Sequence, residues 1–275
     1  MRIFVGTLFT IENEFDECVE SIKGQSYRNF QHFIFENLPN KEAHNTLYSS
    51  FMNMSCEFDL LIKVDADMVI GDKNLFSNIV NKFLNNAWLN ELEIAVHDFF
   101  SDQLIWGLHV YRNIVKWEKN EERLFVDSSP VPSHQRLYDD KYLAPAAIHC
   151  KNPSLFQSFH YGVHRGLKIL QPDRTTKIRS HRKFHWNNLE RTWQNFLNKG
   201  DIRLGQAVLG SELVLKRLLG LDNLDYSNQY TSEIFKSYQN YDSNKLRSKI
   251  QRMRITNWGF LPSKLRRKVL CFQMD

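Results

Sequence analysis

An apolar stretch that ends in two closely spaced acids restricts the fold of this chain more than any other feature. The stretch Asp59–Val64 reads Asp-Leu-Leu-Ile-Lys-Val, and Asp65-Ala66-Asp67 follows it directly. It is short and apolar enough to be a central strand of a sheet. Ligands of open α/β sheets bind beyond the carboxyl ends of the strands. We therefore expect the two acids at a binding edge of the sheet.

This strand is the third in an alternation of strands and helices. Strands are predicted at 2–6 and 30–35, and helices at 12–23 and 41–52. Such crossovers favour a parallel sheet with right-handed connections. Downstream, the periodicity predicts a helix at 74–84, strands at 93–100, 104–115 and 142–149, and a helix from 153 to about 170. We expect an α/β domain over 1–175 and a mainly helical region over 176–275.

Composition excludes several classes of protein. The 275 residues contain no apolar stretch long enough to span a membrane, and the N-terminus does not read as a signal peptide. The four cysteines form no CxxC pair, which fits a reducing compartment and gives no zinc signature. We expect a cytoplasmic protein.

Two carboxylates at positions i and i+2 can bind a hard divalent cation such as Mn²⁺ or Mg²⁺, which takes oxygen ligands. A nucleotide-sugar carries a diphosphate leaving group, and a bound cation neutralises the charge that develops as this group departs. Asp65 and Asp67 are therefore the candidate cation ligands. An isolated D-x-D also occurs as a solvated turn, so its position after the third strand is what favours a function.

A second segment supports this interpretation. The run Ser21–Phe30, SIKGQSYRNF, resembles the S-I-x-x-Q-[ST]-Y-x-N-[FY] signature of family 2 glycosyltransferases. The resemblance covers roughly residues 1–100 and implies a GT-A fold, which is a Rossmann-like, mostly parallel sheet flanked by helices. It also implies a nucleotide-diphosphate sugar donor and a cation at Asp67, with Asp65 near the ribose or the cation. By the same resemblance, the expected contacts to the nucleotide are Thr7, Phe9, Glu36 and Asn37.

The chain departs from that family in two places. Glu36-Asn37-Leu38-Pro39 replaces the usual Asp-Asp-Gly-Ser turn, which leaves the base of the nucleotide undefined. No Glu-Asp pair begins a later helix, where inverting members keep their general base. The stereochemical outcome of the transfer is therefore open.

Histidines downstream of the acids are candidates to complete the site. His149 ends the predicted strand 142–149 and is our first choice as a third cation ligand. On the next helix His160 and His164 lie four residues apart, with Lys168 a further turn along. These are alternative ligands or contacts to acceptor and diphosphate. We assign His164 to catalysis and Lys168 to the diphosphate, while a core role for either histidine stays open.

An inverting transfer needs a carboxylate to deprotonate the acceptor hydroxyl. Asp98 and Asp102 follow a predicted strand and are favoured for this role over Asp139 and Asp140. Each of the four also fits a loop position without chemistry.

The C-terminal segment is basic and amphipathic. Residues 245–268 hold nine Lys and Arg residues, whereas Asp275 is the only acid after residue 244. This composition favours peripheral contact with an anionic membrane at its inner face, and a self-packed tail is the alternative. No nucleic-acid-binding motif accompanies it.

The leading hypothesis is a metal-dependent glycosyltransferase that acts on a saccharide or lipid-linked acceptor in cell-surface polysaccharide synthesis. The main alternative is a protein on the same scaffold that binds nucleotide-sugar, or docks to a membrane, without turnover. A nucleotidyltransferase ranks third, because Gly6–Thr10 has one glycine where that class has a glycine-rich loop.

Overall fold

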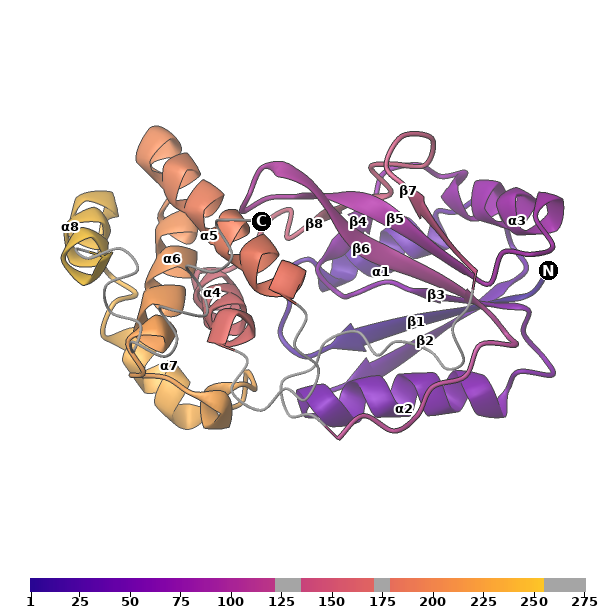
Figure 1. Cartoon of the computed structure of the whole chain (residues 1–275), viewed down its shortest axis with the longest axis horizontal. Coiled ribbons are helices and arrows are strands. Elements are labelled where there is room, and N and C mark those ends of the chain that lie inside the picture. Colours follow the sequence, from indigo (N-terminus) through magenta and orange to yellow (C-terminus); the bar gives the residue numbers. More distant parts are fainter. Residues whose placement is uncertain (122–134, 171–178, 255–275) are drawn as a thin grey trace. The chain divides into compact units, whose positions relative to one another are not determined.

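The computed structural model describes residues 1–121, 135–170 and 179–254, with only the backbone described for 179–181. The chain divides into two compact units, Met1–Pro153 and Ser154–Asp275. This division lies one helix earlier than the boundary predicted near residue 175. The helix that follows Pro153 packs against later helices, so it belongs to the second unit (Figure 1).

The first unit is built on a mixed sheet. Its strands are β1 (Ile3–Phe9), β2 (Phe30–Glu36), β3 (Leu60–Lys63), β4 (Met68–Ile70), β5 (Glu91–Asp98), β6 (Gln103–Arg112), β7 (Arg136–Asp139) and β8 (Ala147–His149). Their order is β2-β1-β3-β6-β5-β8-β4, with β7 also paired to β5. Four of the described strand pairs are parallel and three are antiparallel. The predicted α/β class with a mostly parallel sheet is therefore confirmed.

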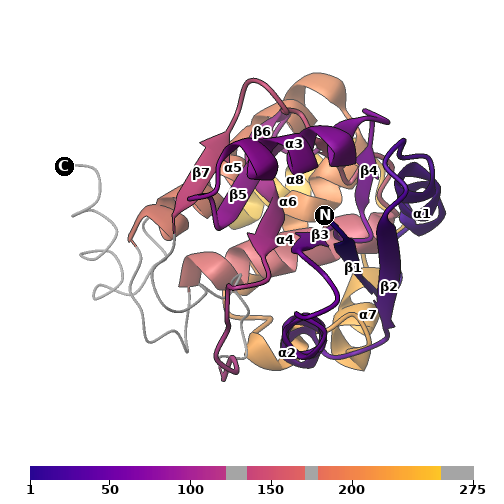
Figure 2. The same ribbon diagram turned by 90° about the vertical axis from the view of Figure 1, so that its right-hand side faces the viewer.

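Helices cover both faces of this sheet. Figures 1 and 2 show α2 (Asn40–Asn53) on one side, and α1 (Phe15–Lys23) and α3 (Leu75–Asn85) on the other. The face under α2 holds a core of buried, mainly aromatic side chains: Phe4, Leu47, Tyr48, Phe51, Phe58, Leu61, Tyr111, Val115 and Trp117. Burial of these large apolar surfaces fixes the crossovers that bring the ends of β1 and β3 to one edge.

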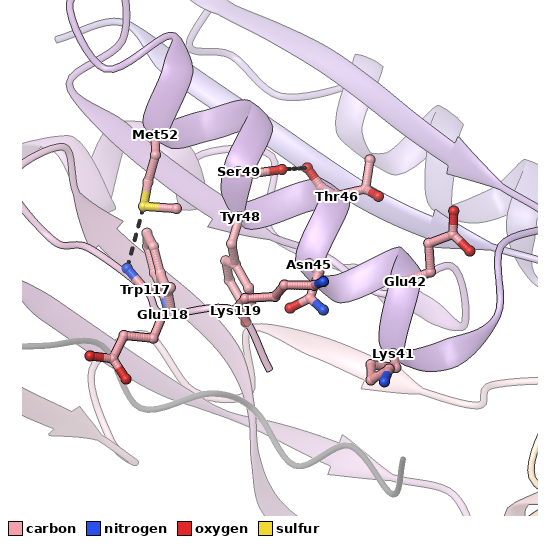
Figure 3. Close-up of a pocket in the computed structure, with 10 residues that line it drawn as sticks. All are labelled: Lys41, Glu42, Asn45, Thr46, Tyr48, Ser49, Met52, Trp117, Glu118 and Lys119. Atoms are coloured by element: carbon pink, nitrogen blue, oxygen red, sulfur yellow. Dashed lines mark hydrogen bonds between the residues drawn. The ribbon is translucent and has the colours of Figure 1, made fainter. Parts of the chain in front are cut away.

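A groove of about 550 Å³ runs along α2 beside this core. Figure 3 shows the stacked rings of Tyr48 and Trp117 at its floor, 4.5 Å apart, and the Trp117 backbone N–H donating to Met52 Sδ. None of the acids predicted to bind a cation lines the groove. The groove is therefore not the candidate cation site.

The second unit is helical in the residues described, as predicted. It contains α4 (Leu155–Leu170), α5 (Arg179–Lys199), α6 (Ile202–Leu215), a short 3₁₀ turn η1 (Leu221–Asn223), α7 (Gln229–Lys236) and α8 (Ser243–Arg254). The α4 and α6 backbones touch at Gly162, where an added Cβ would lie 1.7 Å from the Ala207 carbonyl oxygen. Glycine is required there because no side chain fits between the helices.

Helix α8 accounts for the first part of the basic amphipathic tail. Its apolar residues Leu246, Ile250 and Met253 are buried, and α8 packs against α6. This apolar face is therefore occupied within the second unit instead of facing lipid, which agrees with the self-packed alternative for 245–254. Residues 255–275 lie outside the described part of the chain. Within the described residues, no helix has the length and apolar character needed to cross a bilayer.

Candidate functional site

The two acids lie in a turn between the middle and one edge of the sheet. β3 pairs with β1 on one side and β6 on the other, and it is buried throughout. The turn is closed by a hydrogen bond from the Met68 backbone N–H to the Asp65 carbonyl, 2.9 Å long. Met68 then begins the edge strand β4. The acids are thus held between two paired strands, β3 and β4, and their role in binding stays a prediction.

His149 and Cys150 meet the carboxylate of Asp67. Antiparallel β4 and β8 place Met68 opposite His149, and the Cys150 backbone N–H donates to the Asp67 carbonyl at 2.8 Å. His149 Nε2 lies 3.4 Å from Asp67 Oδ2, and Cys150 Sγ lies 3.2 Å from the same oxygen. The three side chains offer ligand atoms that all lie within 4.8 Å of one another. Backbone pairing, not side-chain flexibility, therefore brings these groups together.

A second layer of contacts orients His149. Its Nδ1 lies 2.7 Å from Asp98 Oδ1, across the parallel β5–β8 pair. The other oxygen of Asp98 accepts hydrogen bonds from the backbone N–H and the hydroxyl of Ser101. Asp98 is fully buried, and a carboxylate behind a histidine fixes the ring so that Nε2 can bind a cation. This position favours an orienting role over the predicted role as acceptor base.

Asp67 and His149 shift each other's pKa in opposite directions. Burial opposes ionisation of Asp67, but the charge and hydrogen bond of His149 outweigh it and lower the pKa of Asp67. Burial disfavours the charged form of His149, yet the neighbouring Cys150 and Asp67 raise the pKa of His149 well above its usual value. A protonated His149 and a bound cation would therefore compensate the same negative charge.

Two neighbouring groups report the negative potential around Asp67. Burial raises the pKa of Glu12 to about 7, against the Thr10 backbone N–H and with help from the charge of Asp67. Burial also raises the pKa of the Cys18 thiol to about 12, and the charges of Asp67 and Asp65 add to this shift. Both shifts arise mainly from burial and favour the neutral forms of Glu12 and Cys18, so of these three groups only Asp67 supplies negative charge that attracts a cation.

The residues present fit a divalent metal. Asp67 Oδ1 is buried and has no hydrogen-bond partner among the described residues, which leaves one carboxylate oxygen able to accept a ligand bond. The nearby donors are the imidazole nitrogen of His149 and the sulfur of Cys150. Carboxylate, imidazole and thiolate are ligands of first-row divalent metals.

Asp65 does not belong to this group of ligand atoms. Its carboxylate pairs with Lys63, whose Nζ lies 2.8 Å from one oxygen and 3.0 Å from the other. The Lys63 side chain is 3% exposed, whereas that of Asp65 is 34% exposed. The buried Lys63 ammonium thus holds the Asp65 carboxylate, which is partly open to solvent.

The residues expected to contact the nucleotide lie where β1 and β2 end. Thr7 is buried, with its hydroxyl 2.9 Å from His32 Nε2, and the ring of Phe9 stacks on Phe15 at 3.7 Å. Glu36 pairs with Phe9 in the parallel register, and the Asn37 backbone N–H donates to the Phe9 carbonyl. Parallel pairing thus gathers these four positions at one edge.

The remaining candidates are distributed differently. Asp102 is about half exposed and ion-pairs with His97 at 3.2 Å. His164 and Lys168 lie on α4 in the second unit, where His164 Nε2 hydrogen-bonds the Leu224 carbonyl at 2.8 Å. Burial lowers the pKa of His164 to about 4. The buried position of His164 and its hydrogen bond to Leu224 are those of a packed structural histidine.

Sequence reasoning did not assign Cys150, Ser101 or Glu12 to the site. The adjacency of Cys150 to His149 is the one signal in the sequence, and the scattered cysteines form no metal-binding spacing that would add to it. Ser101 lies three residues after Asp98, as expected for a side chain that caps a turn. Glu12 accepts hydrogen bonds from the backbone of Thr10 and Ile11, a local contact without a sequence motif.

Comparisons with known proteins gave distant structural similarity. No model of a protein family and no curated protein matched the chain. Among solved structures, A197 from STIV aligns at TM-score 0.33 and 11% identity, over 42% of this chain and 66% of that one. A mannosyltransferase from Pyrobaculum calidifontis, PcManGT, solved in complex with GDP-Man and Mn²⁺, aligns at TM-score 0.40 and 9% identity. That alignment covers 92% of this chain and 85% of the other.

Proposed function

We propose that the first unit is the catalytic part of a metal-dependent glycosyltransferase that uses a nucleotide-diphosphate sugar. The observation that carries this proposal is the Asp67 carboxylate, with one oxygen buried and unpartnered among the described residues and the other beside His149. A divalent cation bound there, Mn²⁺ or Mg²⁺, would neutralise the charge of a departing diphosphate.

The other residues take roles that follow from their positions. Asp67 and His149 would hold the cation, and Asp98 would fix the His149 ring. Asp65, positioned by Lys63, would face the ribose or the cation at the solvent side of the turn. Glu36 and Asn37 lie where the nucleoside would extend along the ends of β1 and β2.

Among the predicted bases, Asp102 suits proton transfer better than Asp98. A general base must reach the acceptor hydroxyl, and Asp98 is fully buried whereas Asp102 is about half exposed. The acceptor is proposed to be a saccharide or lipid-linked saccharide of a cell-surface polysaccharide. Membrane contact through residues 255–275 belongs to the same proposal.

The test is Asp67→Asn, which keeps the shape of the side chain and removes its charge. We expect loss of nucleotide release from nucleotide-sugars in the presence of Mn²⁺, and loss of Mn²⁺ binding by calorimetry. Asp16→Asn, on the solvent side of α1, is the matched control and should keep both properties. Turnover that persists in Asp67→Asn, or in the wild type with excess chelator, would contradict the proposal. Donor binding without turnover for every donor would favour the non-catalytic alternative.

A further inference from the structure

The position of Cys150 is unusual for a cysteine without a role. Its side chain is buried, and its backbone has a φ of 53°, in the left-handed region that non-glycine residues seldom adopt. Such a conformation persists when surrounding contacts enforce it, and it clusters at functional sites. Here the Cys150 backbone N–H is bound to the Asp67 carbonyl, and the residue turns its sulfur back onto the Asp67 carboxylate.

The Cys150 sulfur lies among atoms that could bind a metal ion. It lies 3.2 Å from Asp67 Oδ2 and 3.6 Å from His149 Nε2, so the three atoms surround one point. The unpartnered Asp67 Oδ1 is an independent sign that this group accepts a further bond. Three protein ligands with positions left open for substrate are the usual arrangement of a catalytic transition-metal site.

We propose that Cys150 Sγ is the third protein ligand of the cation, beside Asp67 and His149. The inference rests on the proposed function, because the cation is the one that would bind the donor diphosphate. When the metal binds, the Cys150 S–H bond and the Nε2–H bond of protonated His149 would each break, the freed electron pairs on sulfur and Nε2 would bind the metal, and both protons would leave to solvent.

A thiolate ligand would determine which metals the site prefers. Thiolate and imidazole favour Zn²⁺ and Co²⁺, whereas Mg²⁺ requires oxygen ligands. The expected order of affinity is Zn²⁺ above Co²⁺ above Mn²⁺, with Mg²⁺ far weaker. A site built from Asp67, His149 and oxygen ligands would follow the same order with weaker discrimination against Mg²⁺, so a spectroscopic sign of the thiolate is needed to identify Cys150.

Cobalt is the probe, because a thiolate bound to Co²⁺ gives a charge-transfer absorption band in the near ultraviolet. We expect this band when Co²⁺ is titrated into the full-length wild-type chain, and its suppression by Zn²⁺ but not by excess Mg²⁺. Cys150→Ser should lose the band and bind Co²⁺ at least about tenfold more weakly, since even outer-sphere ligand partners contribute 10- to 100-fold. Cys18→Ser is the matched control, because Cys18 is also buried in the first unit and should keep the band.

The outcomes separate this inference from the proposed function. Tight Co²⁺ binding without a thiolate band, or a band that survives in Cys150→Ser, overturns the role of Cys150. If Asp67→Asn still abolishes cation binding in that case, the proposed function stands. A wild-type chain that binds neither Co²⁺ nor Mn²⁺ overturns both. The wild-type spectrum gives an answer even if Cys150→Ser does not fold.

Discussion

Protonation of His164 should destabilise the second unit, and the size of the effect follows from its pKa. Burial lowers that pKa from 6.5 to about 4, so between these values the unfolded chain binds a proton that the folded chain does not. The contribution of neutral His164 to the free energy of unfolding is therefore fully present above pH 6.5 and is lost as the pH falls toward 4. Each pKa unit corresponds to about 1.4 kcal/mol, which gives about 3 kcal/mol in full. About 2 kcal/mol of this is lost by pH 5.

The assay is urea unfolding at pH 7 and pH 5, with His164→Gln compared with the wild type. Glutamine can still donate to the Leu224 carbonyl but does not titrate, so the variant should lose about 2 kcal/mol less than the wild type between the two pH values. Equal losses in wild type and His164→Gln would refute the assignment of His164 as a neutral structural residue.

Two further predictions concern packing and the cation. Gly162→Ala should destabilise the second unit by about 3 kcal/mol or more in urea unfolding, because its Cβ would lie 1.7 Å from the backbone of α6. Gly71→Ala is the control and should be nearly neutral, because no atom lies within 4 Å of the added Cβ. A stable Gly162→Ala would contradict the close contact of α4 and α6. Asp98→Asn should weaken cation binding by about 10- to 100-fold in calorimetry, because His149 loses its orienting charge. Asp102→Asn should leave cation affinity unchanged, and equal weakening by both variants would refute an orienting role specific to Asp98.

The sequence predicted the elements that carry a strong periodic signal. The helix predicted at 74–84 is found at Leu75–Asn85, and the strand predicted at 30–35 is found at Phe30–Glu36. The three-residue strand β4 and the four-residue strand β7 were not predicted, because such short segments show too few alternations to be recognised. The strand expected at 142–149 is reduced to Ala147–His149, after a loop that contains Pro145.

The site was predictable only in part. The closeness of Asp67 and His149 agrees with their predicted positions at the ends of two strands, and their role as cation ligands stays a prediction. The placement of Cys150 depends on the β4–β8 register and on a left-handed backbone conformation, and neither is encoded in residue spacing. The buried state of Asp98 depends on the pairing of β5 with β8, which joins residues about fifty positions apart in the chain.

The pairing of β4 with β8 also has a consequence for how the protein matures. Asp67 and Cys150 are separated by 83 positions, and β6 and β5 lie between β3 and β8 in the sheet. A nascent chain that has emerged only as far as β6 has the D-x-D turn but lacks His149 and Cys150, two of the three side chains that meet at the candidate site. If the proposed cation site binds metal, its capture would require the last strand of the first unit, and a chelator should slow or reverse that final step more than any earlier one.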